Sequence, residues 1–285
     1  MILPPEPVSP QDVAEHYDSL DLFYRDAWGE ELHHGYWETG DESSAAAIEQ
    51  LRETVLALAE IEPGNAVCDV GCGYGTAALY LAESRQAQVT GVTLSEVQCA
   101  EAERKAARSG SGALKPRFLC CDWLENPFED ASFEVVISIE CLSHVSDKAD
   151  FFAEAKRVLK RGGRLSLTAW TVRETTPKWA NRWLLAPICH EGRFAGLVSS
   201  GELESLVTAS GLTVERIETI GPQVKKTWRV IFRRLVKLVL TKKEYRRFLR
   251  QNLRSDRFFA FTVIRVLIAY ETGMLDYAIL KARRW

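Results

Sequence analysis

The sequence predicts an α/β fold built on a doubly wound, mostly parallel sheet of seven strands. Short apolar runs alternate with helix-forming segments across residues 45–170, which is the pattern of a parallel sheet with crossover helices. The run over 133–139 is nearly all apolar, as expected for a strand covered on both faces. A glycine-rich turn follows the first run, and such sheets bind ligands beyond the carboxyl ends of their strands.

The expected elements follow the chain in order. An extended, proline-rich leader precedes the aromatic segment 11–37, which predicts a helical lid. Strands are expected at residues 67–70, 88–93, 117–121, 133–139, 164–170, 212–220 and 275–281. Helices are expected between the early strands and, later in the chain, at 202–210, 225–257 and 258–271.

Local signals predict several helix boundaries. The segment Ser95-Glu96-Val97-Gln98 has the pattern of a capping box, with Ser95 as the N-cap and Gln98 reaching back to it. Asp147 should cap the helix that Gly162-Gly163 ends. An amphipathic helix should begin near Ser43 and stop at Pro63-Gly64.

The glycine-rich turn lies within residues 67–76, Val-Cys-Asp-Val-Gly-Cys-Gly-Tyr-Gly-Thr. Glycine is needed where a backbone turns sharply or approaches a ligand closely, and the N–H groups that open the next helix face whatever lies over the turn. A dinucleotide site would require G-x-G-x-x-G and an acid about 20 residues later. Here Thr76 stands at the third glycine position, Thr93 replaces the acid, and Asp69 precedes the turn.

This turn resembles the first motif of class I S-adenosylmethionine-dependent methyltransferases. The block Gly-Val-Thr-Leu-Ser-x-x-Gln at 91–98 is similar to that of the γ-tocopherol methyltransferase-like enzymes and the related mycolic acid cyclopropane synthases. The segments 16–18, 32–37, 138–148 and 270–273 resemble the same groups, so the likeness covers nearly the whole chain. It implies a Rossmann-like sheet with an N-terminal helical lid and a C-terminal helical insertion before the last strand.

Three parts of the chain are expected on this basis. Residues 1–44 form the leader and lid, 45–170 form the core that binds S-adenosylmethionine, and 171–285 form an acceptor-binding cap with the last strands.

The resemblance also implies a cofactor site. Asp69 and the glycine backbone would hold the methionine portion, and the tyrosine of the lid would reach the cofactor's carboxylate. Thr93, Leu94 and Gln98 would contact the ribose and adenosine, and Asp122 the adenine amino group. Gln98 can instead be a capping residue alone, and Asp122-Trp123 a turn acid with a packed aromatic. The expected cofactor-binding residues are Tyr17, Tyr36, Trp37, Asp69, Gly71, Cys72, Gly73, Thr93, Leu94, Gln98, Asp122, Trp123 and Ile139.

Methyl transfer from a sulfonium needs alignment of the reacting atoms and exclusion of water, and it needs a base only if the acceptor must lose a proton. Glu140 is the first catalytic candidate, because a charge directly after a buried strand is hard to explain by packing. It could take a proton or stabilise a cation formed on an alkene carbon. His144 and the lid residue His34 are further candidates, and each of the three has a purely structural alternative. No histidine has metal-ligand spacing, so no metal is expected.

The net charge of −3 hides an uneven distribution of charge. Residues 1–150 contain 9 Lys and Arg against 28 Asp and Glu, whereas residues 151–285 contain 27 against 11. The basic residues concentrate in 225–257, interleaved with apolar ones, so this region could grip a diphosphate, rest on an anionic membrane or form a solvated face. Nucleic-acid binding is not expected, because the chain contains no recognised module for it.

Seven cysteines without C-x-x-C spacing predict free thiols in a reducing compartment. No stretch approaches the ~20 apolar residues of a spanning helix, and the first residues lack the pattern of a signal peptide. The expected location is therefore cytoplasmic, with peripheral membrane contact as an alternative.

The sequence thus predicts an S-adenosylmethionine-dependent methyltransferase with a small hydrophobic acceptor. Aromatic residues in the C-terminal part favour an isoprenoid, a prenyl diphosphate or a prenylated or aromatic natural product. Carbon methylation is expected ahead of nitrogen or oxygen methylation. Two alternatives from other classes are an NAD(P)-dependent oxidoreductase and a non-catalytic protein that binds membrane surfaces. A homo-oligomer is also left open.

Overall fold

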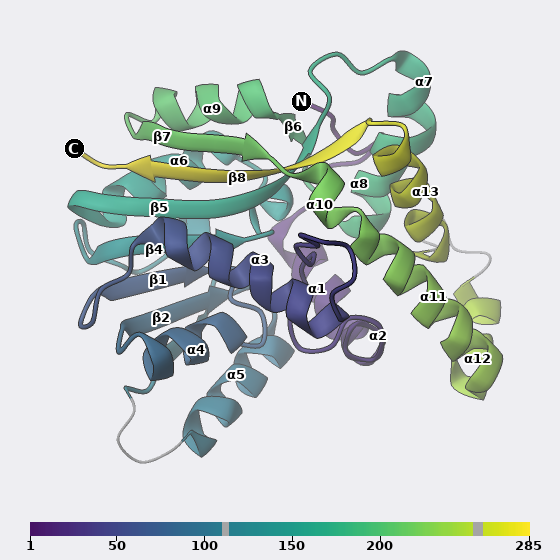
Figure 1. The fold of residues 1–285 in the computed structure, drawn as a ribbon, viewed down its shortest axis with the longest axis horizontal. Helices are drawn as coiled ribbons and strands as arrows, with labels where there is room; N and C mark the ends of the chain where they lie inside the picture. Colours follow the sequence, from purple (N-terminus) through teal and green to yellow (C-terminus); the bar gives the residue numbers. More distant parts are fainter. Residues whose placement is uncertain (110–113, 253–258) are drawn as a thin grey trace.

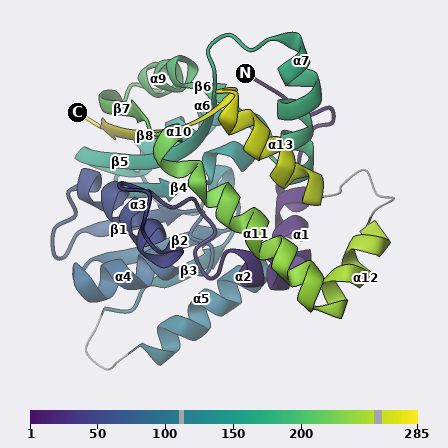
Figure 2. The same cartoon turned by 45° about the vertical axis from the view of Figure 1, so that its right-hand side comes forward.

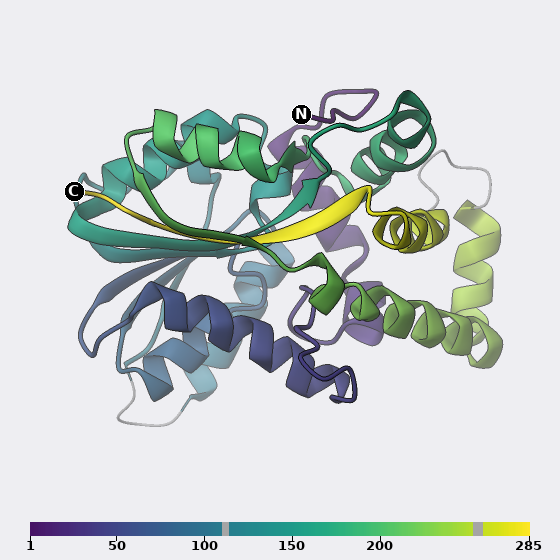
Figure 3. The ribbon, with the colours of Figure 1, turned by 45° about the horizontal axis from the view of Figure 1, so that its top comes forward.

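The computed structural model describes residues 1–109, 114–252 and 259–285. A twisted sheet runs through the centre of the molecule, with helices on both of its faces (Figures 1 and 3). Its strands are β1 (Ala66–Val70), β2 (Gln88–Thr93), β3 (Arg117–Cys120), β4 (Phe133–Ile139), β5 (Leu159–Val172), β7 (Thr213–Thr219) and β8 (Leu275–Arg283).

The strand order is β3-β2-β1-β4-β5-β8-β7, and a two-residue strand, β6 (Val198–Ser199), pairs with β5 beside this path. The pairs from β3 to β5 are parallel, and β8 is antiparallel to both β5 and β7. The structure therefore confirms the predicted mostly parallel sheet. Because the order reverses between β1 and β4, a crevice for a ligand is expected at their carboxyl ends.

Two layers of helices bury the faces of the sheet. One face is covered by α3 (Ser44–Ala59), α4 (Thr76–Ser84) and α5 (Glu96–Arg108), and the other by α6 (Lys148–Val158) and α9 (Ser200–Ala209). In β4 the side chains of Val135, Val136 and Ile137 are fully buried, because helices pack on both of its faces.

The lid and the cap lie at the carboxyl edge of the parallel strands (Figures 1 and 3). The lid contains α1 (Pro10–Ser19) and α2 (Asp21–Ala27). The cap contains α7 (Lys178–Ala180), η3 (Asn181–Leu185), α8 (Ala186–Gly192), α10 (Gly221–Val224), α11 (Lys226–Thr241), α12 (Lys243–Asn252) and α13 (Phe259–Glu271). Residues 253–257 of the predicted basic helical region, and residue 258 of the helix predicted after it, lie outside the described residues.

Two predicted helix ends and one predicted capping box differ from the structure. The helix α6 is capped by Asp147 as expected, but it ends at Val158, and β5 already begins at Leu159. The helix α3 ends at Ala59, because Glu60 adopts a left-handed conformation before Pro63 is reached. Ser95 caps α5, yet the capping box is incomplete, since the Gln98 side chain bonds to Thr93 instead.

All seven cysteines are free. None of the helices in the described part of the chain combines the length and apolar character that crossing a membrane requires.

Candidate active site

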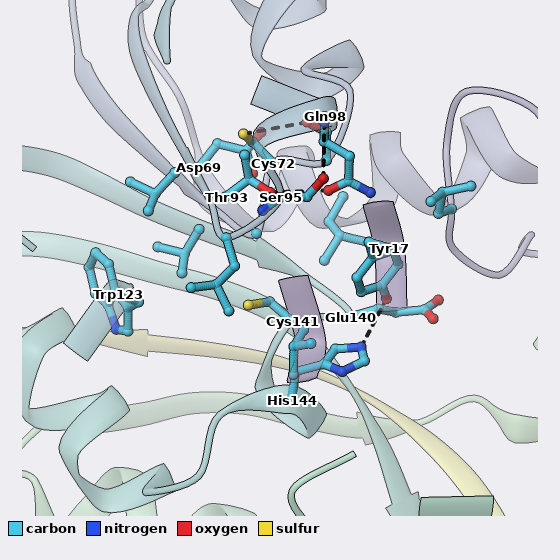
Figure 4. Close-up of a pocket in the computed structure, with 18 of the residues that line it drawn as sticks. Tyr17, Asp69, Cys72, Thr93, Ser95, Gln98, Trp123, Glu140, Cys141 and His144 are labelled. Carbon is cyan, nitrogen blue, oxygen red and sulfur yellow. Dashed lines mark hydrogen bonds between the residues drawn. The ribbon is translucent and has the colours of Figure 1, made fainter. Parts of the chain in front are cut away.

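A cavity of about 140 Å³ opens at the carboxyl edge of β1, β2 and β4, beneath α1 of the lid (Figure 4). The segment that follows each of these strands lines the cavity, and the turn after β3 lines it as well. The predicted cofactor residues that line it are Tyr17, Asp69, Gly71, Cys72, Gly73, Thr93, Leu94, Gln98, Asp122, Trp123 and Ile139. Residues that are distant in sequence thus meet at the edge where a doubly wound sheet binds ligands.

The turn after β1 fits closely against the segment that follows β4. The backbone N–H groups of Gly71 and Cys72 both donate to the carbonyl of Val92, at 2.8 and 2.9 Å. Gly71 has a φ of 78°, and a Cβ added there would lie 2.5 Å from the Cβ of Cys141. Only glycine satisfies both conditions, so the backbone itself forms this wall of the cavity.

Asp69 is the buried charge at the centre of the site. It pairs in register with Gly91 of β2 and Ile137 of β4, and only 2% of its surface is exposed. Its Oδ2 atom has no hydrogen-bond partner among the described residues. Burial raises the pKa of Asp69 to about 7, although the charge of His33 opposes this shift. A buried carboxylate without a partner fits a cationic ligand group, such as the amino group of S-adenosylmethionine.

The segment after β2 is tied both to its own helix and to the lid. The Thr93 hydroxyl donates to Oε1 of Gln98 at 3.1 Å, which holds both side chains at the cavity wall. The Ser95 hydroxyl donates to the carboxylate of Asp18, which closes α1 over the start of α5. Sequence reasoning missed Ser95 as a contact of the lid, because its capping role already explained it.

Asp122 and Trp123 line the cavity and also have structural partners. A carboxylate oxygen of Asp122 accepts from the N–H of Leu124 at 2.9 Å and so caps the short helix η1 (Trp123–Glu125). The indole N–H of Trp123 donates to the carbonyl of Phe151 at 3.2 Å. Asp122 therefore acts as a turn acid and Trp123 as a packed aromatic, and both residues also line the cavity.

Tyr36 and Trp37 line neither this cavity nor a second, smaller one that lies beyond Glu140. The chain turns away at Gly35, which packs so tightly on Ala47 that a Cβ would lie 2.7 Å from the Cβ of Ala47. Trp37 is buried beside α11, and its indole N–H donates to the hydroxyl of Thr227 at 3.0 Å. Trp37 thus fastens the end of the lid to the cap, whereas the backbone N–H of Tyr36 donates to the carbonyl of Ala47 in α3 at 2.7 Å. Both placements differ from the cofactor contact that the sequence suggested.

Glu140 accepts four hydrogen bonds. Its Oε1 atom accepts from the backbone N–H of His34 at 2.6 Å, from the ring of His34 at 2.8 Å and from the hydroxyl of Tyr277 at 2.8 Å. Its Oε2 atom accepts from the indole of Trp170 at 2.8 Å. The residue adopts a φ of 60°, a left-handed conformation that is uncommon for any residue with a side chain.

These donors keep Glu140 ionised. Burial alone would raise its pKa, but the charge of His34 and its hydrogen bonds outweigh burial and lower the pKa to about 2. The indole of Trp228 donates to Nε2 of His34 at 2.7 Å, and an indole can only donate. His34 therefore carries a proton on Nδ1 and donates it in a hydrogen bond to Oε1 of Glu140.

A second cavity of about 60 Å³ lies beyond Glu140 and His144, between the lid and the cap. Four residues line both cavities and so stand at their junction: Tyr17, Leu32, Glu140 and His144. The remaining lining residues are mostly aromatic or aliphatic: Tyr24, Trp28, His34, Trp170, Ile188, Gly192, Phe194, Trp228, Thr262 and Val266. Trp170 and Tyr24 were not singled out from the sequence, although the aromatic richness of the lid was a signal.

His144 is held at the junction by two hydrogen bonds. Its Nδ1 atom lies 2.9 Å from the carbonyl of Arg193, and its Nε2 atom 2.9 Å from the hydroxyl of Tyr17 (Figure 4). A carbonyl can only accept, so Nδ1 carries the proton and Nε2 accepts from Tyr17. Burial lowers the pKa of His144 to about 4, which leaves the ring neutral at pH 7.

Comparison with known proteins agrees with this geometry. Residues 7–251 match the family described as mycolic acid cyclopropane synthetase. The chain is 30% identical over 222 residues to 27-O-demethylrifamycin SV methyltransferase of Amycolatopsis mediterranei, which covers 77% of this chain and 80% of that protein. It is 30% identical over 291 residues to a probable chloroplastic tocopherol O-methyltransferase of Oryza sativa subsp. japonica, which covers 96% and 78%.

Solved structures share the fold. A mycolic acid cyclopropane synthase crystallised with S-adenosylhomocysteine (SAH) matches with a TM-score of 0.84 and 23% identity, over 99% of each chain. The family match and the sequence relatives confirm the predicted enzyme class and cofactor, and they set aside the oxidoreductase and the non-catalytic binding protein. The chain therefore belongs to the mycolic acid cyclopropane synthetase family and is a class I methyltransferase that uses S-adenosylmethionine.

Proposed function

We propose that the protein methylates a hydroxyl oxygen of a small, largely apolar molecule, with His144 as the general base. The observation that carries this proposal is the place of His144, whose proton-free Nε2 atom lies where the cofactor cavity meets the second cavity. A hydroxyl must lose its proton as it gains a methyl group, and a neutral imidazole within hydrogen-bond reach can accept that proton.

The present partner of Nε2 is replaceable. Tyr17 belongs to the lid, and its hydroxyl occupies the position that an acceptor hydroxyl would take. The pKa of Tyr17 is raised by burial, so its hydroxyl keeps its proton and donates it to Nε2. An acceptor that enters the second cavity would displace Tyr17 and inherit a hydrogen bond of the same kind.

The other side of the junction would hold the methyl donor. S-adenosylmethionine supplies a methyl group already activated on a sulfonium sulfur. Asp69 would bind the amino group, and the backbone from Gly71 to Gly73 would position the methionine portion. The lid, fastened through Asp18 to Ser95, would exclude water from the reacting atoms.

The second cavity favours an apolar acceptor without a diphosphate. Its walls include the rings of Trp28, Trp170, Phe194 and Trp228. No Lys or Arg is among the described residues that line either cavity, so neither supplies the cations that a diphosphate needs. Two relatives are named for a rifamycin and a tocopherol, which supports acceptors of this apolar kind.

Carbon methylation, which the sequence alone favoured, is the second candidate. It is supported by Glu140, an ionised carboxylate whose side chain is 9% exposed and which could stabilise a carbocation. Oxygen methylation comes first because both carboxylate oxygens of Glu140 are already engaged by donors. An acceptor can displace Tyr17 from His144, whereas the donors that bind Glu140 stay in place.

The test pairs hydrophobic alcohols or phenols with analogues in which the hydroxyl is replaced by hydrogen. We expect a product heavier by one methylene from the hydroxyl compounds alone, with NMR assigning the new methyl group to oxygen. The His144→Gln variant should bind SAH normally but turn over slowly. A methyl group attached to carbon, or unchanged turnover by His144→Gln, would refute the proposal.

A further inference from the structure

The cap exposes large apolar side chains along four elements, α7, η3, α11 and α13. On α11, Phe232, Val236 and Leu240 recur every four residues and are 39%, 42% and 73% exposed. The helix α13 contacts both α11 and η3, and η3 contacts α7. Figure 2 shows α13 next to α11. We call the exposed set the outer cap face, and its apolar members are Trp179, Trp183, Phe232, Val236, Leu240, Ile264 and Ile268.

Such a surface is unusual for a face that meets only water. Single exposed apolar residues are normal, but a cluster of them on adjacent elements marks a site of contact. Trp183 is 64% exposed and Trp179 is 51% exposed, although indole rings are among the side chains most often covered. The outer cap face therefore has the character of a contact site for an apolar partner.

Basic residues run beside this apolar row. Arg229, Arg233 and Lys237 also recur every four residues on α11, one position after Phe232 and Val236 in the helical repeat. Lys178 and Arg182 lie next to the two tryptophans. Within the described parts of α7, η3, α11 and α13, Glu271 is the acidic residue, and it already pairs with Lys225 and Arg229.

The inner sides of the same helices form the wall of the second cavity. Trp228 of α11 and Val266 of α13 line that cavity, one helix thickness from the outer cap face. An apolar acceptor held in a lipid layer against this face would lie close to the place where it reacts. The cavity of about 60 Å³ suits the reacting end of such a molecule, while the remainder stays outside.

We propose that the outer cap face docks on an anionic lipid surface. Helices with Trp, Phe and Leu beside rows of Lys and Arg lie in the plane of a membrane interface, where the apolar side chains enter the acyl boundary and the cations meet the headgroups. An acidic protein would satisfy the cations but would leave the exposed Leu240 and Trp183 without an apolar environment. The surface thus fits an anionic lipid layer better than an acidic protein.

The test is flotation of the full chain with vesicles of phosphatidylcholine alone or mixed with phosphatidylglycerol. It is run without cofactor or acceptor, so its result is independent of the methylated atom. We expect binding to the anionic vesicles and at least about tenfold weaker binding to the neutral ones. High salt should weaken the binding because it screens the cations.

Two double variants separate the two components of the surface. Arg233→Glu with Lys237→Glu should weaken binding to anionic vesicles by at least about tenfold, because two attractions become repulsions. Phe232→Ser with Leu240→Ser should weaken it by a similar factor through lost apolar burial. The control is Lys115→Glu with Arg161→Glu, two exposed basic residues at the amino edge of the sheet, and it should bind as the unchanged chain does.

All variants are first checked for an unchanged thermal shift with SAH, which shows that the fold is intact. Equal binding to neutral and anionic vesicles, or none, would overturn the proposal. Loss with the charge variant but not with the serine variant would show that headgroup attraction alone holds the chain and would overturn the part assigned to the apolar side chains. A dimer in light scattering that the serine variant converts to a monomer would assign the face to a second copy of the chain.

Discussion

The hydroxyl of Tyr17 lies 2.9 Å from Nε2 of His144, and this hydrogen bond joins the lid to the segment that follows β4. Because Nδ1 of His144 is bound to the carbonyl of Arg193, Nε2 is the ring atom that can receive a proton. The lid therefore covers the proposed base in this structure, and an acceptor must displace Tyr17 before it can react.

Replacing His144 with Gln should lower kcat by about 10²–10⁴-fold, the range typical for a lost general base. Affinity for SAH should stay within about twofold, because His144 holds neither Asp69 nor the glycine turn. Since the pKa of His144 is about 4, wild-type kcat should not depend on this group from pH 6 to 8 and should fall only near pH 4. Steady-state kinetics and isothermal titration provide both measurements, and an unaltered kcat would exclude the role.

The affinity for SAH should rise with pH below about 7. Burial raises the pKa of Asp69 to about 7, so its carboxyl group is largely protonated at lower pH and must ionise to bind the amino group of the ligand. The expected slope is about tenfold per pH unit below that value, with a plateau above it. Calorimetry in buffers of different ionisation heat would detect the released proton. Asp69→Asn should bind weakly without this slope, and a slope that persists in the variant would assign it to another group.

Glu140→Gln should lower the free energy of unfolding by roughly 2–4 kcal/mol, because an amide cannot accept from all four donors. The folded-state pKa of Glu140 is lowered to about 2, so its contribution is complete above the unfolded-state value of about 4.3. It is lost as the pH falls from there towards about 2. Urea unfolding of both proteins between pH 3 and 7 measures this, and an equal acid dependence would contradict it.

Gly71→Ala should abolish SAH binding, whereas Gly64→Ala should not. Both glycines have positive φ, 78° and 83°, so both variants carry a similar backbone strain of about 1 kcal/mol. The added Cβ meets Cys141 only at Gly71, since nothing lies within 4 Å at Gly64. Adding Cys141→Gly to Gly71→Ala removes that contact and should restore part of the binding. Equal effects of the two single variants would show that strain alone matters.

The sheet was predictable because its signals are local. The apolar run of β4, the turn at Gly71 and the cap at Asp147 each depend on a few adjacent residues. The glycine turn also indicated which edge of the sheet binds the cofactor.

The network around Glu140 was not predictable, since it depends on residues that are far apart in sequence. A lone acid after a strand suggested a base, and nothing near it indicates that His34 and Tyr277 donate to it. The turn of the lid at Gly35 was missed for the same reason, because Ala47 and Thr227 direct the chain there. Gln98 was placed in a capping box, yet the buried hydroxyl of Thr93 competes for its side chain.

The position of β8 between β5 and β7 has a consequence for the order of folding. Tyr277 on β8 donates to Glu140, 137 positions earlier, and Trp228 binds the ring of His34, 194 positions earlier. Contacts that close such long loops form late, since the chain must first lose the freedom of everything between them. The cofactor cavity, which lies at the carboxyl edge of β1, β2 and β4, can thus form before the second cavity. A chain released before residue 275 would lack Tyr277, which donates to Glu140 at the junction of the two cavities.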